Sequence, residues 1–122
     1  MKKVLIIEDE TIISFGYRLQ LENLGFEVIG TARSSDEAEQ LMAQERPDAI
    51  IMDVYLKGPT NGLELAQRIQ GKDPVPIIFL TASTRPEILE GIRALDGCHY
   101  LMKPIDPDSL TGLLNVAVHG HA

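Results

Sequence analysis

The chain alternates between short, uninterrupted runs of apolar residues and longer segments in which apolar residues recur every three or four positions. Residues 49–52 form one such run, which stops at the single carboxylate of Asp53. A short, continuously apolar run predicts a strand that is buried on both faces, as in a parallel sheet covered by helices. Four similar runs predict the remaining strands, at residues 4–7, 26–29, 77–80 and 100–102. Residues 26–29 include Glu27, and such a polar interruption is typical of an edge strand.

Helical spacing predicts five helices, one after each strand. The first is expected to end before Gly25, a residue type that commonly follows the last turn of a helix. Apolar residues and one glycine recur at helical spacing along it and are predicted to form its buried face, with the last one closing the pattern: Ile12, Phe15, Gly16, Leu19 and Leu24.

Capping residues predict where three of the other helices begin. Ser34 with Glu37, and Thr84 with Glu87, have the spacing of a capping box. The dipeptide Asp106-Pro107 places a capping residue before a proline at the first helical position. The inward-facing positions expected in these helices and in the third one are Ala38, Leu41, Met42, Leu63, Ala66, Ile69, Ile88, Ile92, Leu95, Leu110, Leu113, Leu114 and Ala117.

Strands that alternate with helices in this way predict right-handed crossovers onto a parallel sheet. The expected architecture is therefore a three-layer, doubly wound α/β fold. A chain of 122 residues is long enough to bury a substantial core without disulfides or metals. We expect residues 1–122 to form a single domain.

Composition and charge exclude several classes of protein. The net charge is 11 − 18 = −7, and no segment concentrates basic residues, so direct binding to nucleic acid is not expected. No apolar run approaches the roughly 20 residues that a membrane span needs, and the apolar run after Met1 is too short for a signal peptide. The single cysteine, Cys98, fits a reducing compartment and is expected to be a small packing residue. These features predict a cytoplasmic protein without a membrane partner.

Charged and polar residues follow four of the predicted strands at the point where each strand ends. Glu8-Asp9, Asp53, Thr81 and Lys103 occupy these positions. Ligands of parallel sheets bind beyond the carboxyl ends of the strands, so these side chains are expected to meet at one edge. Three carboxylates repel one another unless a cation is present, and oxygen ligands suit Mg²⁺. A lysine beside such a site indicates that an anion also binds, and a phosphoryl group is the obvious candidate.

Each of these residues has an ordinary structural explanation when it is taken alone. Glu8-Asp9 also fits the start of a helix, where acids complement the helix dipole. Asp53 fits a turn, Thr81 the end of a strand, and Lys103 a solvated surface. The functional interpretation depends on the combination, because the four positions come from four separate strands.

In this combination the sequence resembles the receiver domain of two-component response regulators. The resemblance covers residues 2 to about 118 and depends on the acid pair after the first strand, Asp53 after the third, Thr81-Ala82 after the fourth and Lys103-Pro104 after the fifth. It implies a flavodoxin-like (βα)5 fold whose five parallel strands have the order 2-1-3-4-5. Two departures occur: the acid pair begins with a glutamate, and the loop after Asp53 is one residue longer than in most receivers.

The resemblance also implies a role for each of these positions. Asp53 is similar to the phosphoacceptor, and Lys103 to the lysine that contacts the phosphoryl group and precedes a cis-proline, here Pro104. Glu8, Asp9, Asp53 and the backbone carbonyl of Tyr55 correspond to the Mg²⁺ ligands. Thr81 and Tyr100 correspond to a switch pair that rearranges on phosphorylation.

The function implied is that of a signalling switch and not of an enzyme acting on external substrates. Its expected partners are a histidine kinase or histidine phosphotransfer protein as the donor, and a downstream protein or a second copy as the target. The target is expected to bind the face made by the fourth helix, fifth strand and fifth helix, where Leu89 and Val116 lie off the inward stripes.

Three other functions remain open at this point. A phosphatase with an aspartyl nucleophile would have a second aspartate two residues after Asp53, where this chain has Tyr55. A protein that binds flavin mononucleotide would have a glycine- and hydroxyl-rich loop after the first strand, where residues 8–10 are all acidic. A pseudo-receiver would keep the fold and act as an unphosphorylated binding module.

Overall fold

A computed structural model describes residues 2–56, 61–82 and 85–119. Within these residues, five strands alternate with five helices, as the apolar pattern predicts. The strands are β1 (Lys3–Ile7), β2 (Glu27–Ala32), β3 (Ala49–Met52), β4 (Ile77–Thr81) and β5 (Cys98–Met102). The helices are α1 (Thr11–Asn23), α2 (Ser35–Gln44), α3 (Gly62–Lys72), α4 (Pro86–Arg93) and α5 (Pro107–His119).

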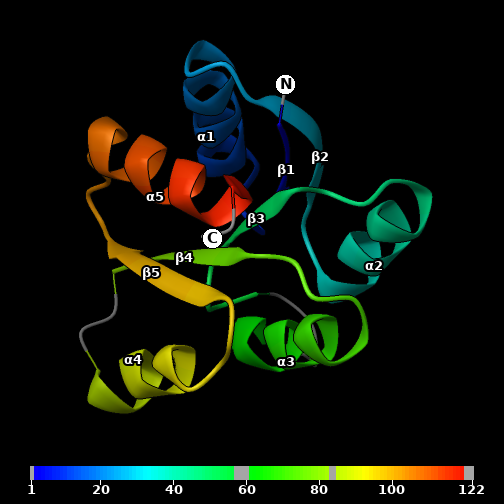
Figure 1. Ribbon diagram of the computed structural model, residues 1–122, viewed down its shortest axis with the longest axis vertical. Coiled ribbons are helices and arrows are strands. Elements are labelled where there is room, and N and C mark those ends of the chain that lie inside the picture. The colour runs from blue at the N-terminus through cyan, green and yellow to red at the C-terminus, as the bar shows by residue number, and fades with distance from the viewer. Residues whose placement is uncertain (1, 57–60, 83–84, 120–122) are drawn as a thin grey trace.

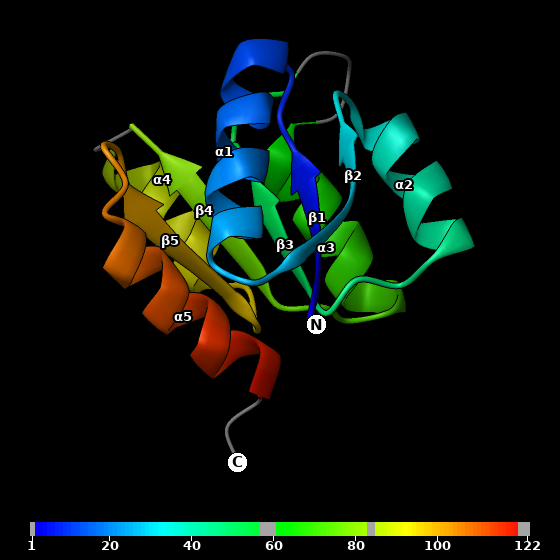
Figure 2. The ribbon, with the colours of Figure 1, turned by 90° about the horizontal axis from the view of Figure 1, so that it is seen from above.

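The strands form one parallel sheet in the order β2-β1-β3-β4-β5. Figures 1 and 2 show α1 and α5 on one face of this sheet and α2, α3 and α4 on the other. The predicted three-layer α/β fold and its strand order are therefore confirmed, and β2 is an edge strand.

The core consists of two buried clusters, one on each face of the sheet. Alternate residues of a strand point to opposite faces, so in β1 Leu5 and Ile7 enter the cluster beneath α2, α3 and α4. Val4 and Ile6 enter the cluster beneath α1 and α5. All four side chains are fully buried, which explains why the strand has no polar alternation.

The buried face predicted for α1 is wrong apart from Leu24. Ile12 is 87% exposed, Phe15 is 59% exposed and Leu19 is 47% exposed, and Gly16 is exposed as well. These residues form an apolar stripe on the outer surface of the helix, which we call the α1 stripe (Ile12, Phe15 and Leu19).

A different set of α1 residues faces the sheet, spaced three and four positions apart. Ser14 and Leu21 are buried, and Tyr17 and Leu24 pack against the core cluster on this face. Ser14 can be buried because its hydroxyl donates a hydrogen bond to the Thr11 carbonyl at 3.0 Å. The helix carries apolar residues on two faces, so the periodicity alone does not decide which face is buried. The prediction chose the outer face.

The starts of α2 and α5 follow the predicted caps. Ser34 Oγ accepts a hydrogen bond from the Glu37 amide at 3.3 Å, although Glu37 accepts in return from the amide of Arg33 and not from that of Ser34. At α5, the Asp106 carboxylate accepts from the Ser109 amide at 3.0 Å, and Pro107 is the first helical residue.

The starts of α3 and α4 differ from the predictions. Thr84 lies outside the described residues, and α4 begins at Pro86 with Arg85 as its N-cap and no side-chain cap. At α3, for which no cap was predicted, Asn61 and Glu64 form a full capping box. Otherwise the inward positions predicted for α2, α3, α4 and α5 lie in, or pack against, the two clusters, except for Ala117, which is only half-buried.

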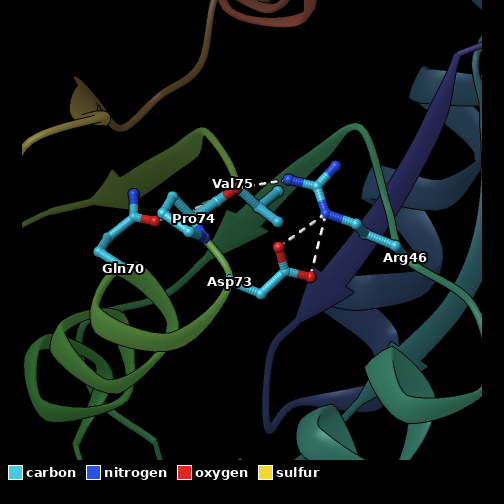
Figure 3. A network of polar contacts seen from close by, with 5 residues as sticks. All are labelled: Arg46, Gln70, Asp73, Pro74 and Val75. Carbon is cyan, nitrogen blue, oxygen red and sulfur yellow. Dashed lines mark hydrogen bonds and ion pairs between the residues drawn. The ribbon is translucent and has the colours of Figure 1, made fainter.

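An arginine ties together two connections at the amino ends of the strands (Figure 3). Arg46, between α2 and β3, donates from Nε to both carboxylate oxygens of Asp73 at 3.1 Å and from Nη2 to the Pro74 carbonyl at 2.5 Å. The Val75 amide donates to Gln70 Oε1 at 3.0 Å. These bonds fix the segment that leads into β4. They lie at the amino ends of the strands, whereas the polar residues that follow the strands lie at the carboxyl ends, on the opposite edge of the sheet. None of the helices in the described ranges is long and apolar enough to span a membrane.

Candidate functional site

Three polar residues are held at one edge of the sheet by backbone bonds to neighbouring strands. The Glu8 amide donates to the Ala32 carbonyl at the end of β2, at 2.9 Å. The Asp53 amide donates to Ile7 of β1 at 3.1 Å, and the Lys103 amide donates to Thr81 of β4 at 2.8 Å. Each residue therefore continues the ladder by one step beyond its strand, which brings side chains from distant parts of the sequence together.

Asp53 and Lys103 form an ion pair at this edge. Lys103 Nζ lies 3.4 Å from Asp53 Oδ2, and the two side chains are 27% and 17% exposed, respectively. Burial acts to lower the pKa of Lys103, but the charges of Asp53, Tyr17 and Glu8 outweigh it and raise the pKa above its ordinary value. Lys103 therefore stays cationic beside the carboxylate. The peptide bond between Lys103 and Pro104 is cis, the isomer that the resemblance implies.

Glu8 is the most deeply buried acid of the site, at 3% exposure. Burial, assisted by the nearby carboxyl groups of Asp53 and Asp9, raises the pKa of Glu8 from 4.5 to about 8, although a hydrogen bond from the Glu10 amide acts in the opposite direction. The acid pair and Asp53 are thus close enough to affect one another. The carboxyl group of Glu8 therefore keeps its proton to a higher pH than an ordinary glutamate when no cation neutralises the cluster.

The donor atoms of this cluster fit a hard cation such as Mg²⁺ in chemical type. Glu8, Asp9 and Asp53 offer carboxylate oxygens, and their mutual repulsion is what a divalent cation would relieve. Their side chains are not already arranged as a chelating group: in the described part of the chain, no three His, Cys, Asp or Glu side chains are placed to hold a metal ion together. Mg²⁺ needs only one or two protein carboxylates, since water and phosphate oxygens complete its shell.

Hydrogen bonds from the amides of Tyr55 and Gly62 fix Asp53 and the residue that follows it. The Tyr55 amide donates to Asp53 Oδ1 at 3.1 Å, which orients the carboxylate, whereas the Tyr55 side chain is 53% exposed. The Gly62 amide donates to the Val54 carbonyl at 2.7 Å. A Cβ at Gly62 would lie 2.5 Å from the Asp53 carbonyl oxygen and 2.8 Å from that of Val54. This close approach explains a glycine here. Lys57, in the same loop, lies outside the described residues.

Thr81 and Tyr100 lie on the same face of the sheet but are not opposite each other. Thr81 is 1% exposed and is in register with Met102, whereas Tyr100 is in register with Phe79, two residues earlier in β4. Tyr100 packs against the cluster that contains Phe79, and its hydroxyl accepts a hydrogen bond from Arg93 Nη2 at 2.6 Å. The two residues of the expected switch pair are therefore diagonal neighbours across the β4–β5 ladder.

Two residues near the site escaped the sequence analysis. Tyr17 lies on the inner face of α1, and the charge of Lys103 and a hydrogen bond with it act to lower the pKa of its hydroxyl, although burial outweighs both and raises the pKa. Arg93 contacts Tyr100. Tyr17 would have been found if the buried face of α1 had been placed correctly, but no sequence pattern pairs Arg93 with Tyr100.

Comparison with known proteins gives the family of this chain. Residues 4–115 match the response regulator receiver domain family. The transcriptional regulatory protein PdtaR of Mycobacterium tuberculosis is 33% identical over 117 residues, which is 96% of this chain and 57% of PdtaR. The chain thus spans little more than half the length of that relative.

Two solved structures extend the likeness to the fold. The signal receiver domain of a modulated diguanylate cyclase from Desulfovibrio desulfuricans superposes with a TM-score of 0.89 and 34% identity, covering 98% of this chain and 94% of that one. The anti-anti-sigma factor PhyR from Bartonella quintana superposes with a TM-score of 0.78 and 31% identity, covering 97% of this chain and 47% of that one. The chain therefore belongs to the response regulator receiver domain family of two-component signalling.

Proposed function

We propose that this receiver domain, expected to comprise residues 1–122, is a switch that accepts a phosphoryl group on Asp53 from a histidine kinase or a histidine phosphotransfer protein. The observation that carries this proposal is the Asp53–Lys103 pair. A carboxylate that is only 17% exposed faces an ammonium group at 3.4 Å, at the edge of the sheet where ligands bind. A cation held there can neutralise a phosphoryl oxygen as well as the carboxylate.

The transfer step requires little from the protein besides position and charge. A carboxylate oxygen of Asp53 attacks the phosphorus of a phosphohistidine. The new O–P bond forms as the N–P bond breaks, and the imidazole leaves with the electron pair and takes up a proton. Lys103 stabilises the charge on the transferred oxygens, and the Tyr55 amide, which donates to Asp53 Oδ1, holds the carboxylate in place. Thr81 is assigned a hydrogen bond to a phosphoryl oxygen.

We assign Glu8, Asp9, Asp53 and the Tyr55 carbonyl to a Mg²⁺ site. When bound, Mg²⁺ supplies positive charge that shields the incoming phosphoryl group from these carboxylates. Burial is the main cause of the raised pKa of Glu8, but part of the rise comes from the carboxyl groups of Asp53 and Asp9. That part supports this assignment, because a cation would relieve the repulsion between these acids. Glu8 reaches further than an aspartate and is assigned a contact through water.

The proposal is tested with a small phosphodonor. Wild-type protein incubated with Mg²⁺ and acetyl phosphate should gain the mass of one phosphoryl group. Asp53→Asn should gain none, and excess EDTA should abolish the gain in the wild type. An equal gain in Asp53→Asn, or a gain that survives EDTA, would contradict the proposal.

The α1 stripe is proposed as the surface on which the phosphodonor protein docks. Ile12 lies in the first turn of α1, three residues after Asp9, so the stripe starts at the rim of the site and runs away from it. Isolated exposed apolar residues are common, but three in helical register beside a reactive group form an apolar surface suited to a partner. A donor seated there would have its phosphohistidine within reach of Asp53.

Comparing a protein phosphodonor with a small one distinguishes a docking defect from a defect in phosphoryl transfer itself. Phe15→Asp should slow phosphotransfer from phosphorylated histidine phosphotransfer domains that label the wild type, and should leave labelling by acetyl phosphate unchanged. Glu39→Ala, on the far side of the sheet, is the control. Equal rates from the protein donors for Phe15→Asp and the wild type would rule out the α1 stripe as the docking surface.

The output surface is proposed to be the face made by α4, β5 and α5, which would bind a downstream protein or a second copy. Val116 is 63% exposed and Met102 is 36% exposed, whereas Leu89 is half-buried. The likeness to PhyR, which is described as an anti-anti-sigma factor, supports a protein as the target. A pseudo-receiver would keep this face but would not be labelled by acetyl phosphate, so the same experiment distinguishes the two.

A further inference from the structure

The hydroxyl of Tyr100 is fixed at the surface by the last residue of α4. Arg93 Nη2 donates to the Tyr100 hydroxyl oxygen at 2.6 Å, and the Arg93 guanidinium carbon lies 5.4 Å from the centroid of the Tyr100 ring. Two interactions thus join the same pair of side chains. Hydrogen bonds from charged donors are roughly twice as strong as those between neutral groups.

Arg93 has no competing carboxylate partner within the described residues. The ion pairs found there involve other cations, and Asp96, three residues further along the chain, is not one of their members. The position also suits a cation, because Arg93 ends α4 and positive charge is favourable at a helix carboxyl end. The guanidinium group is therefore available to Tyr100 without a rival.

The contact opposes movement of Tyr100 towards Thr81. Tyr100 is in register with Phe79, and Thr81 lies two residues further along β4 on the same face of the sheet. Arg93 is exposed and Tyr100 is half-buried, whereas Thr81 is fully buried. Arg93 precedes the connection to the amino end of β5, whereas Thr81 is the last residue of β4. We therefore expect a rotation of the ring towards Thr81 to move the hydroxyl away from the guanidinium and break the hydrogen bond.

We infer that Arg93 is a positioning residue that holds Tyr100 outward and so sets the free-energy difference between the two states of the switch. The inference rests on the proposed function, together with the rearrangement of Thr81 and Tyr100 on phosphorylation that the family resemblance implies. Arg93 belongs to α4 and Tyr100 to β5, so breaking their contact also releases the end of α4. In this way the contact between Arg93 and Tyr100 transmits the signal from the site to α4.

Thermodynamic linkage gives the test. If Arg93 stabilises the outward state, in which Tyr100 contacts it, removing Arg93 shifts the equilibrium towards the inward state, in which the ring lies towards Thr81. A ligand that favours the inward state must then bind more tightly, by the factor by which that equilibrium shifts. The ligand is beryllofluoride with Mg²⁺, as a mimic of the phosphoryl group. We expect Arg93→Ala and Tyr100→Phe each to lower the dissociation constant about fivefold, at the low end of allosteric couplings. The double variant should gain no more than either single one.

The matched control is Arg68→Ala, which removes the same charge from the surface of α3, where Arg68 pairs with Glu39 at 3.2 Å. It should leave the affinity for the mimic within twofold of the wild type. An unchanged affinity in Arg93→Ala, or additive effects of the two single variants, would overturn the inference. A wild type that binds no mimic would overturn the proposed function and this inference with it.

A direct view of the ring comes from fluorotyrosine labelling. The chain has 3 tyrosines and no tryptophan, so its fluorine spectrum has three signals, which Tyr→Phe variants assign. The Tyr100 signal of free Arg93→Ala should shift towards its position in the mimic-bound wild type, and the Tyr17 signal should not. A Tyr100 signal that is the same in free Arg93→Ala and free wild type would overturn the inference even if affinities changed.

Discussion

The burial of Glu8 among other acids determines how the metal-free protein responds to pH. Its pKa is 4.5 in the unfolded chain and about 8 in the folded state. Between these values the folded state holds the proton more tightly. The stabilisation from this proton is therefore fully present below about pH 4.5 and is lost as the pH rises through about 8.

We expect wild-type protein in EDTA to have a lower melting temperature at pH 8.5 than at pH 5.5, roughly several degrees on the scale of a domain of this size. Glu8→Gln cannot lose this proton, so its melting temperature should depend less on pH over the same interval. Thermal unfolding followed by circular dichroism measures both. The same pH dependence in the two proteins would show that Glu8 does not carry the effect.

Lys103 is the cation that neutralises the cluster when no metal is bound. Lys103→Met keeps the length of the side chain and removes its charge, so Asp53 and Glu8 lose their partner. In EDTA we expect a loss of about 1 to 2 kcal/mol in the free energy of unfolding, between the values for exposed and buried pairs. The loss should be larger at pH 8 than at pH 5, because the fraction of ionised Glu8 is larger at the higher pH. Urea unfolding measures it, and an equal loss at both pH values would contradict the assignment.

At the scale of single elements, the first turn of α3 is packed directly against the backbone that follows β3. Gly62→Ala would place a Cβ 2.5 Å from the Asp53 carbonyl oxygen, and the backbone must move to admit it. We expect a loss of about 1 to 3 kcal/mol in the free energy of unfolding, together with slower labelling by acetyl phosphate.

Gly71, in the same helix, is the matched control for that substitution. A Cβ there would have nothing within 4 Å, so Gly71→Ala should stabilise by up to about 1 kcal/mol through helix propensity. Urea unfolding of the two variants makes the comparison. Equal effects of the two substitutions would show that the close approach at Gly62 does not matter.

The orientation of α1 is tested by comparing its two apolar faces. Leu21 is fully buried and Phe15 is 59% exposed. We expect Leu21→Ala to cost about 2 to 5 kcal/mol in the free energy of unfolding, as in other cores. Phe15→Ala should stay within about 0.5 kcal/mol of the wild type. A larger loss in Phe15→Ala than in Leu21→Ala would contradict this orientation and would support the buried face that the periodicity predicts.

These elements also show what can be predicted from the sequence. The strands could be located because each is buried on both faces and so reads as an unbroken apolar run. The orientation of α1 could not, since Ile12 and Phe15 repeat at helical spacing just as Tyr17 and Leu21 do. Only the packing of the whole helix decides between two apolar faces, one of which then remains on the surface.

The candidate site was predictable in its members but not in its contacts. The polar residues at the strand ends mark the positions of Glu8, Asp53 and Lys103, because parallel strands bring their carboxyl ends to one edge. The burial of Glu8, the closeness of Gly62 to the Asp53 carbonyl and the contact of Arg93 with Tyr100 depend on side-chain placement. None of these three leaves a periodic signal.

For the molecule as a whole, the stabilising contacts of Arg46 and the candidate functional site lie at opposite edges of the sheet. Arg46 joins two connections at the amino ends of the strands, whereas the acids and Lys103 follow the carboxyl ends. Arg46→Ala should therefore lower the free energy of unfolding by about 1 kcal/mol, as for an exposed ion pair with good geometry, and leave labelling of Asp53 unchanged. A labelling defect in a variant that is still folded would show that the two edges are coupled.

The most direct test of the account is to find the atom that carries the phosphoryl group. Protein labelled by acetyl phosphate and Mg²⁺ is treated with borohydride, which reduces an aspartyl phosphate to homoserine, and its peptides are then sequenced by mass spectrometry. We expect homoserine at position 53 and aspartate at position 9, the other aspartate of the site. Homoserine at another position, or none anywhere in a labelled protein, would contradict the assignment of Asp53 as the phosphoacceptor.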